Sequence, residues 1–139
     1  MYNIKINDPN IYDNVIERAV RLLRHVEFDT IVFRGFSGAV VGPAVALRLR
    51  KPWALIRKEG DNSHSCKSIE GIVHGDYIII DDFVATGTTI RKIVTACGNA
   101  DCVGVYFYDY GWVEGCNSRE DHRSIKDAIG GVKILNWID

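Results

Sequence analysis

The chain has almost no net charge and no long apolar segment. Its 139 residues include 17 Lys and Arg and 18 Asp and Glu, which gives a net charge of −1 at pH 7. Binding to a nucleic-acid backbone usually needs a positive field, so we expect no nucleic-acid partner. The longest apolar runs, such as residues 44–47, are far shorter than the roughly 20 residues of a membrane-spanning helix, and residues 1–5 do not open a signal peptide. The sequence therefore predicts a cytoplasmic protein with no membrane partner.

Proline is also scarce, and the cysteines lack the spacing of a metal site. Only 3 residues are Pro, whereas 47% are hydrophobic and 25% are charged, which excludes a disordered or collagen-like chain. Cys66, Cys97, Cys102 and Cys116 form no C-x-x-C pair and have no adjacent His at zinc spacing, so reduced, mostly buried thiols are the simpler interpretation. No repeat or linker divides the chain. Its length therefore predicts a single domain over residues 1–139.

Strand-like and helix-like segments alternate along the chain. This alternation predicts an α/β fold, in which a mostly parallel twisted sheet of about five strands carries helices on both faces. Residues 58–75 show little apolar periodicity and much Gly, Asn, Ser and His, so we expect a flexible lid there. The predicted strands are 30–34, 53–57, 77–81, 102–108 and 132–137, and the predicted helices are 9–26, 39–50, 118–129 and one that begins near residue 86.

Polar residues suited to a phosphorylated sugar follow the most apolar predicted strand. In open parallel sheets, ligands bind beyond the carboxyl ends of the strands. Asp81 and Asp82 stand at such an end, where they suit sugar hydroxyls or a hydrated Mg²⁺. Residues 85–89 follow as a turn rich in Thr that opens a helix, and Gly87 allows a phosphate to approach the free N–H groups. Each feature alone is often a helix cap or a solvated strand end, but their combination is specific.

Three segments resemble motifs of the type I phosphoribosyltransferases. Residues 77–89, YIIIDDFVATGTT, resemble the family's phosphoribosyl pyrophosphate (PRPP) motif. Residues 34–38 with 42–46 are similar to the pyrophosphate loop and following helix of adenine-type members, and residues 57–60 to the opening of the flexible loop in orotate-type members. The motifs occur in the family's order and spacing over about residues 30–97. The resemblance implies the family's fold, with a small hood and a flexible lid.

The resemblance also implies a reaction and a set of site residues. Members of the family use Mg²⁺ to transfer the phosphoribosyl group of PRPP to a nucleobase and release pyrophosphate. Asp81 and Asp82 are the implied catalytic residues, and they would also hold the metal. The resemblance assigns the 5′-phosphate to Ala85, Thr86, Gly87, Thr88 and Thr89, and the pyrophosphate to Arg34, Gly35, Phe36, Ser37, Arg57 and Lys58.

Two departures from the family pattern bear on the acceptor base. Asp61 stands where orotate-type members carry a catalytic Lys, which speaks against orotate unless Lys67 substitutes. Ala85 stands where 6-oxopurine-type members carry Asp, which speaks against hypoxanthine and guanine. An adenine-like purine is therefore the first choice. Tyr110 and Trp112 follow a predicted strand and would form a flat wall for the base, although packing against the last helix is an equal alternative.

The same residues would also serve functions other than transfer to a base. A module that senses PRPP or a nucleotide, without catalysis, needs the same carboxylates and phosphate loops. A third alternative is a relative that uses PRPP in an amide or pyrophosphate transfer. Because family members commonly pair, the resemblance also implies a homodimer.

Overall fold

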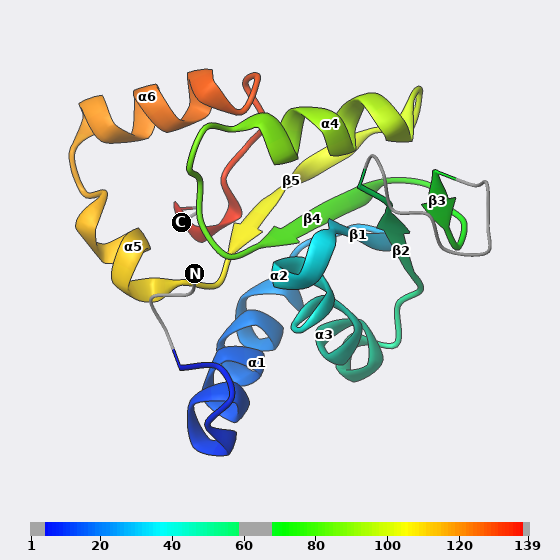
Figure 1. Cartoon of the computed structure of the whole chain (residues 1–139), viewed down its shortest axis with the longest axis horizontal. Helices are drawn as coiled ribbons and strands as arrows, with labels where there is room; N and C mark the ends of the chain where they lie inside the picture. The colour runs from blue at the N-terminus through cyan, green and yellow to red at the C-terminus, as the bar shows by residue number, and fades with distance from the viewer. Residues whose placement is uncertain (1–4, 59–67, 138–139) are drawn as a thin grey trace.

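A five-stranded sheet forms the centre of the structure (Figure 1). The structure is a computed structural model that describes residues 5–58 and 68–137. The strand order is β3-β2-β1-β4-β5, and all neighbours are parallel except β3, which is antiparallel to β2. This confirms the predicted α/β class. The elements are α1 (Pro9–Leu23), β1 (Thr30–Arg34), α2 (Gly35–Ala39), α3 (Gly42–Leu49), β2 (Trp53–Ile56), β3 (Ile69–Glu70), β4 (Tyr77–Asp81), α4 (Thr88–Cys97), β5 (Cys102–Phe107), α5 (Tyr110–Gly115), α6 (Arg119–Ala128) and the 3₁₀ helix η1 (Leu135–Trp137).

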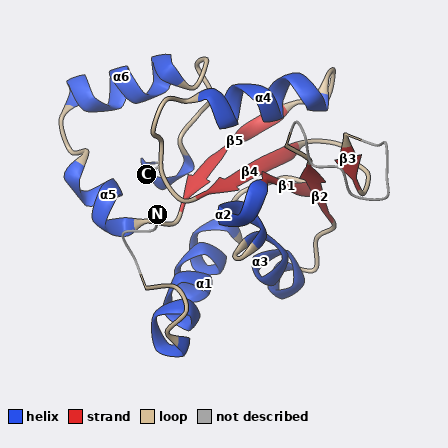
Figure 2. Ribbon diagram, in the orientation of Figure 1, coloured by secondary structure: helices blue, strands red, loops and turns tan. Residues whose placement is uncertain are grey.

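Helices cover both faces of the sheet, as predicted. Figure 2 shows α1, α2 and α3 on one face and α4 and α6 on the other. Successive strand residues point to opposite faces, so Ile78 and Ile80 pack on the α1 side while Tyr77 and Ile79 pack on the α4 side. Burial on both faces explains why β4 is a continuous apolar run rather than an alternating one.

The region after β1 differs from its prediction. Instead of a loop followed by one helix over 39–50, the chain forms two short helices, α2 and α3, that are interrupted between Ala39 and Gly42. Pro43 lies in the first turn of α3, where a missing N–H costs no hydrogen bond. A side chain at Gly42 would collide with the Phe33 ring, so α3 lies unusually close to β1.

The segment predicted as a lid, residues 58–75, is not a loop throughout. Its second part contains β3, which pairs with β2 through Glu70 and Leu55. His74 is also fixed to the sheet, because its N–H donates to the Thr30 hydroxyl at 2.9 Å and that hydroxyl donates to the His74 carbonyl at 2.7 Å. A strand of two residues is too short to give a periodic signal in the sequence. Residues 59–67 of the predicted lid lie outside the described residues.

The predicted last strand, residues 132–137, is wrong. Only Ile134 makes a bridge to β5, at Val105, and the chain then turns into η1. The Asn136 side chain takes over the role of a strand backbone: its Nδ2 donates to the Phe107 carbonyl at 2.7 Å, and the Phe107 N–H donates to its Oδ1 at 2.8 Å. The side-chain amide thus provides hydrogen-bond partners for the Phe107 N–H and C=O at the outer edge of β5, so no further strand is needed there.

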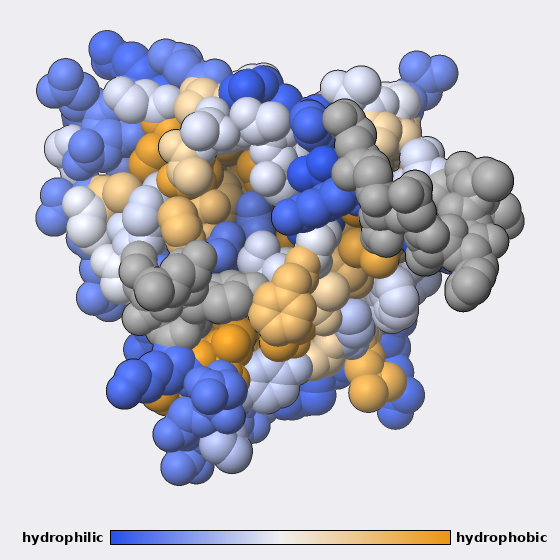
Figure 3. All heavy atoms as spheres, viewed as in Figure 1, coloured by the Kyte–Doolittle hydropathy of each residue, from blue (hydrophilic) through white to orange (hydrophobic). Residues whose placement is uncertain are grey.

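Some apolar side chains remain on the surface. The exposed large ones are Phe36 on α2, Leu47 on α3, Trp53 on β2 and Ile72 after β3. On the face drawn in Figure 3, apolar side chains lie between hydrophilic ones near the middle of the view. None of the helices in the described ranges has the length and apolar character needed to cross a membrane.

Replacing Asn136 by Ala should remove both hydrogen bonds to the buried Phe107 peptide groups. We expect the free energy of unfolding to fall by about 1–3 kcal/mol, because a buried N–H and C=O lose their partners. Urea denaturation measures this loss. Asn99→Ala, in the exposed turn after α4, is the control and should change stability by less than about 0.5 kcal/mol. Equal stability of the two variants would show that Asn136 does not secure the edge of β5.

Candidate functional site

The turn at the start of α4, residues 85–89, presents backbone N–H groups and hydroxyls to one spot. We call it the Thr-Gly turn. Gly87 precedes α4 with a φ of +82°, and a side chain there would collide with the Ala128 carbonyl oxygen. The Thr86 hydroxyl contacts the Thr88 hydroxyl at 2.9 Å and accepts from the Thr88 N–H at 3.3 Å. The N-cap residue Gly87 makes no side-chain cap, so the next N–H groups of the first turn stay available to a ligand. A helix start of this form suits an anion.

The Thr-Gly turn and the carboxylates line one cavity of about 140 Å³, which we call the site cavity. Asp81 and Asp82 come from the end of β4, and Arg34 and Ser37 from the segment after β1. Lys58 follows β2. Three strand ends thus meet at one edge of the sheet, with two cations and two carboxylates around the same space. The predicted site residues that line it are Arg34, Ser37, Lys58, Asp81, Asp82, Ala85, Thr86, Gly87 and Thr89.

The two carboxylates are held in different surroundings. Asp81 is only 5% exposed, and burial, followed by the negative charge of Asp82, raises the pKa of its carboxyl to about 7. A hydrogen bond with the Ser37 side chain acts in the opposite direction. Asp82 is half-buried, and its Oδ1 accepts from the Phe83 N–H at 2.8 Å. The backbone beneath the pair is fixed by β5, because the Tyr108 N–H donates to the Asp81 carbonyl at 3.0 Å.

The carboxylate pair has the chemistry of a Mg²⁺ site. Carboxylate oxygens are ligands that Mg²⁺ prefers, and a nearby cation would offset the repulsion that raises the pKa of Asp81. Over residues 5–58 and 68–137, no group of three or more His, Cys, Asp or Glu side chains could hold a metal. Magnesium commonly needs only one or two carboxylates, since water and substrate phosphates complete its shell. Asp81 and Asp82 therefore fit the ion as one side of a site that a phosphorylated substrate completes.

Only some of the residues predicted to bind pyrophosphate line the site cavity. Gly35 opens α2 with a φ of +72°, and a Cβ there would lie 2.6 Å from Cε of Lys58, so the lysine side chain passes directly over it. Ser37 is fixed by the buried Tyr108 hydroxyl, which donates to its carbonyl at 2.7 Å. Phe36 is 67% exposed and does not line the site cavity, and Arg57 forms an ion pair with Glu70 outside it.

The predicted base-binding residues lie on α5, a helix that the sequence reading missed. Asp109 caps this helix by accepting from the Trp112 N–H at 3.1 Å, and an Asp is a favoured N-cap residue, a signal that could have revealed the helix. The Trp112 ring packs edge-on against Phe107, with centroids 5.3 Å apart. Tyr110 belongs to the apolar cluster on the other face of the sheet, beneath Arg18. Neither aromatic lines the site cavity, and base binding by them stays a prediction.

Arg91 is a structural residue of the site that no sequence motif predicts. It extends from α4 and donates to the Ala128 carbonyl at the end of α6 and, at 3.4 Å, to the Thr86 carbonyl. It also donates to the Thr88 hydroxyl at 3.4 Å. One guanidinium thus ties the Thr-Gly turn to α6.

The cysteines of the described residues are unpaired and half-buried. Cys97, Cys102 and Cys116 are free thiols, and burial raises the pKa of each. Half-burial is less than the mostly buried state that the sequence predicts. Cys66 lies outside the described residues.

Known proteins similar to this chain are phosphoribosyltransferases. It is 32% identical over 89 residues to an orotate phosphoribosyltransferase of Sulfolobus acidocaldarius, covering 63% of this chain and 45% of the relative. It is 30% identical over 112 residues to an adenine phosphoribosyltransferase of Thermosipho melanesiensis, covering 67% of this chain and 64% of the relative. This chain thus spans between about half and just under two thirds of these relatives. No protein-family model matches it.

A solved structure shares the fold. The crystal structure of orotate phosphoribosyltransferase from Aeropyrum pernix is similar with a TM-score of 0.62 and 20% identity, over 73% of this chain and 60% of that one. The shared fold confirms the predicted α/β architecture, a mostly parallel five-stranded sheet with helices.

Asp81→Asn should stabilise the protein at high pH. An unfolded Asp titrates near 3.8, whereas burial raises the pKa of folded Asp81 to about 7. Below pH ~4 the carboxyl is neutral in both states, and above pH ~7 the folded state bears the full cost of a buried charge. We expect the variant to gain on the order of 1–3 kcal/mol at pH 8 and almost nothing at pH 4.

Thermal denaturation across this pH range measures the gain. Asp101→Asn, which removes an exposed carboxylate, is the control and should show no such pH-dependent gain. A destabilised Asp81→Asn protein at pH 8 would mean that the fold compensates the Asp81 charge fully.

Proposed function

We propose that this chain, a member of the type I phosphoribosyltransferase family, transfers the 5-phosphoribosyl group of PRPP to a nucleobase and releases pyrophosphate. The observation that carries this function is the site cavity, where a carboxylate pair, an anion-binding helix start and two cations surround one space. The relatives named orotate and adenine phosphoribosyltransferase support the same class of reaction.

The Thr-Gly turn would hold the 5′-phosphate. Its free N–H groups and the hydroxyls of Thr86 and Thr89 would donate to the phosphate oxygens, and the start of α4 adds partial positive charge. Gly87 lets the turn pack against the end of α6, because a side chain there would collide with the Ala128 carbonyl oxygen. Arg91 would fix the position of the turn from outside without touching the ligand.

Asp81 and Asp82 would hold the ribose and Mg²⁺. Their oxygens would accept hydrogen bonds from the 2′- and 3′-hydroxyls and would hold Mg²⁺, which would supply positive charge beside the pyrophosphate. The buried position of Asp81 matters here, because a carboxylate acts more strongly on a charged neighbour in a medium of low polarity.

Transfer then requires charge stabilisation at both ends of the breaking bond. The bond between ribose C1′ and the pyrophosphate oxygen breaks, and its electron pair leaves with pyrophosphate. A ring nitrogen of the base forms the new bond to C1′, and the N–H proton of the base leaves to water or to the departing pyrophosphate. Positive charge develops on the ribose beside Asp81 and Asp82, and negative charge grows on pyrophosphate beside Arg34 and Lys58. No covalent intermediate with the protein is required.

The acceptor base is the least constrained part of this function. We propose an adenine-like purine first, because Ala85 replaces the Asp of the 6-oxopurine pattern and lies at the site cavity. Asp61 and Lys67, the residues that decide for or against orotate as the acceptor base, lie outside the described residues. Phe83 lines the site cavity, and its ring centroid lies 6.3 Å from that of Trp112. Trp112 would therefore contribute to the wall for the base by packing next to Phe83.

We also propose that the protein works in the cytoplasm as a homodimer of single-domain chains without nucleic acid. Phe36, Leu47 and Trp53 are exposed apolar side chains, and contact with a second copy would remove apolar area from water. Light scattering gives the molar mass of the assembly, and a monomer at high concentration would contradict this part of the proposal.

Incubation with PRPP, Mg²⁺ and a panel of adenine, orotate, hypoxanthine, guanine and uracil tests the reaction through pyrophosphate release. We expect turnover with one base of the panel and a rate about 10²–10³ lower in Asp82→Asn, which removes a charge beside the ribose. Asp127→Asn, on the exposed face of α6, is the matched control and should keep the wild-type rate.

Two outcomes would contradict transfer. If PRPP binds but no base of the panel releases pyrophosphate, transfer to a base is wrong, and the chain either senses PRPP or uses it in an amide or pyrophosphate transfer. If a variant with both Asp81→Asn and Asp82→Asn keeps the wild-type rate, the carboxylates have no catalytic role.

A further inference from the structure

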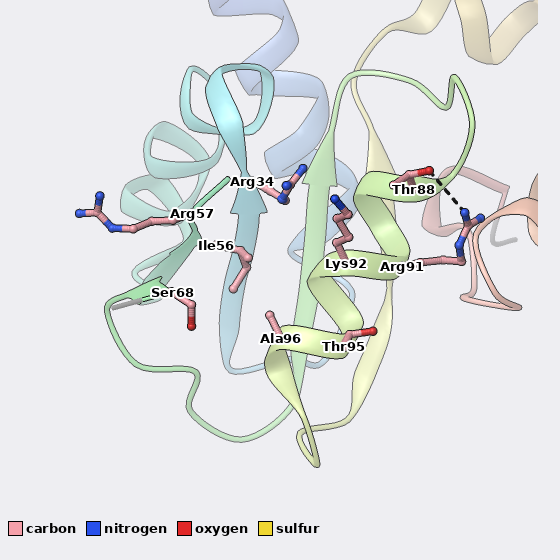
Figure 4. A pocket seen from close by; sticks show the side chains of 9 residues that line it. All are labelled: Arg34, Ile56, Arg57, Ser68, Thr88, Arg91, Lys92, Thr95 and Ala96. Carbon is pink, nitrogen blue, oxygen red and sulfur yellow. Dashed lines mark hydrogen bonds between the residues drawn. The ribbon is translucent and has the colours of Figure 1, made fainter. Parts of the chain in front are cut away.

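A cavity beside α6 shares no described lining residue with the proposed PRPP site. The cavity of about 460 Å³ between β2 and α4 in Figure 4 instead shares Arg34 with the site cavity and belongs to its surroundings. The separate cavity, which we call the α6 cavity, has a volume of about 230 Å³. It lies between α6 and the segment that ends in η1, drawn in red below α6 in Figure 1. Its described lining residues are His122, Lys126, Lys133, Ile134 and Trp137.

Hydrogen bonds of the fold fix the backbone on both sides of the α6 cavity. The Gly131 N–H donates to the Lys126 carbonyl at 2.8 Å, which closes the end of α6. The Val105 N–H of β5 donates to the Lys133 carbonyl at 2.8 Å, and a Cβ at Gly104 would lie 2.7 Å from that carbonyl oxygen. Lys133 is therefore held close against β5. The two lysines thus extend from fixed backbone positions on opposite sides of the cavity.

Two stacked rings form one wall of the α6 cavity. The His122 imidazole lies nearly parallel to the Trp137 indole, with centroids 3.7 Å apart and 7° between the planes. The imidazole is also held from its edge, because its Nε2–H donates to the Cys116 carbonyl at 2.8 Å. Ile134, which is buried, adds an apolar surface beside the rings. Flat and apolar walls of this kind favour an aromatic ring as the ligand.

The charged groups that line the α6 cavity have one sign. Lys126 and Lys133 supply two ammonium groups, and none of the described lining residues carries a carboxylate. Within residues 5–58 and 68–137, neither lysine forms an ion pair. Ammonium groups bind oxyanions through charge-assisted hydrogen bonds, and two of them match the charge of a phosphate monoester, about −1.5 to −2 at pH 7. The lysines therefore favour a phosphate group on the ligand.

The volume of the α6 cavity limits the size of the ligand. Sites for drug-sized molecules usually measure about 300–1,000 Å³, and 230 Å³ lies below that range. A single ring with one phosphate is therefore a better match than a nucleotide, which carries a sugar as well. A bare phosphate would contact the lysines but leave the surfaces of Ile134 and Trp137 in water.

We propose that the α6 cavity is a second ligand site, which binds a small phosphorylated aromatic molecule with a single ring. The phosphate contacts the ammonium groups of Lys126 and Lys133, and the ring packs against Ile134 and the stacked rings of His122 and Trp137. None of these residues takes part in the proposed transfer reaction, so binding here does not rest on that function.

Titration with phenyl phosphate, followed through the tryptophan indole N–H signals in NMR spectra, tests this site. Trp137→Phe identifies the signal of Trp137, which should move as phenyl phosphate is added to the wild-type protein. A variant with both Lys126→Met and Lys133→Met should bind at least about tenfold more weakly, because the charge-assisted contacts are lost. Arg123→Met removes a cation of α6 that does not line the cavity, and it should leave the affinity unchanged.

Two fragments of the same probe separate the contributions of the ring and the charge. Inorganic phosphate lacks the ring and phenol lacks the charge, so each should bind at least about tenfold more weakly than phenyl phosphate. Both lysines are exposed, so the double variant should fold normally, and circular dichroism checks this.

Three results would overturn the second site. A Trp137 signal that does not move, or an affinity that the double lysine variant leaves unchanged, would mean that the lysines are merely solvated and that the ring pair only holds η1 to α6. Equal affinity for phenyl phosphate and inorganic phosphate would remove the role of the ring. Movement of the Trp112 signal alone would place the probe at the site cavity, because the Trp112 ring lies beside Phe83. Failure of the transfer function would appear in the pyrophosphate assay and not in these titrations.

Discussion

Two adjacent carboxylates held at the end of a fully buried strand are the feature on which the rest of the site depends. Burial of Asp81 costs stability, because the charged form leaves water, and Asp82 adds repulsion. The fold bears this cost because β4 packs on both faces and β5 fixes the backbone beneath the pair. The Thr-Gly turn, Arg34 and Lys58 then gather around a fixed point of negative charge.

Signals within short stretches of sequence predicted most of the fold and the centre of the site. The β-branched run of β4 and the Asp8-Pro9 start of α1 are local, and both elements begin where the sequence indicates. The Asp pair and the Thr-Gly turn are neighbours in sequence, so their meeting in space was readily predicted.

The features that the sequence missed depend on contacts between distant segments. Asn136 ends the sheet by bonding to Phe107, and β3 exists because Glu70 lies opposite Leu55. The pairing of Arg57 with Glu70, which takes Arg57 out of the site cavity, is of the same kind.

The central claim, that the Thr-Gly turn and the carboxylate pair form a PRPP site, is tested most directly by calorimetric titration of PRPP into wild type, Gly87→Ala and Gly98→Ala with and without Mg²⁺. Both glycines have positive φ, but a Cβ at Gly87 would collide with the Ala128 carbonyl, whereas one at Gly98 meets nothing within 4 Å. We expect wild type and Gly98→Ala to bind PRPP more tightly with Mg²⁺, and Gly87→Ala to bind at least about tenfold more weakly than either. Equal PRPP affinity in all three proteins, or no binding to wild type, would contradict the account.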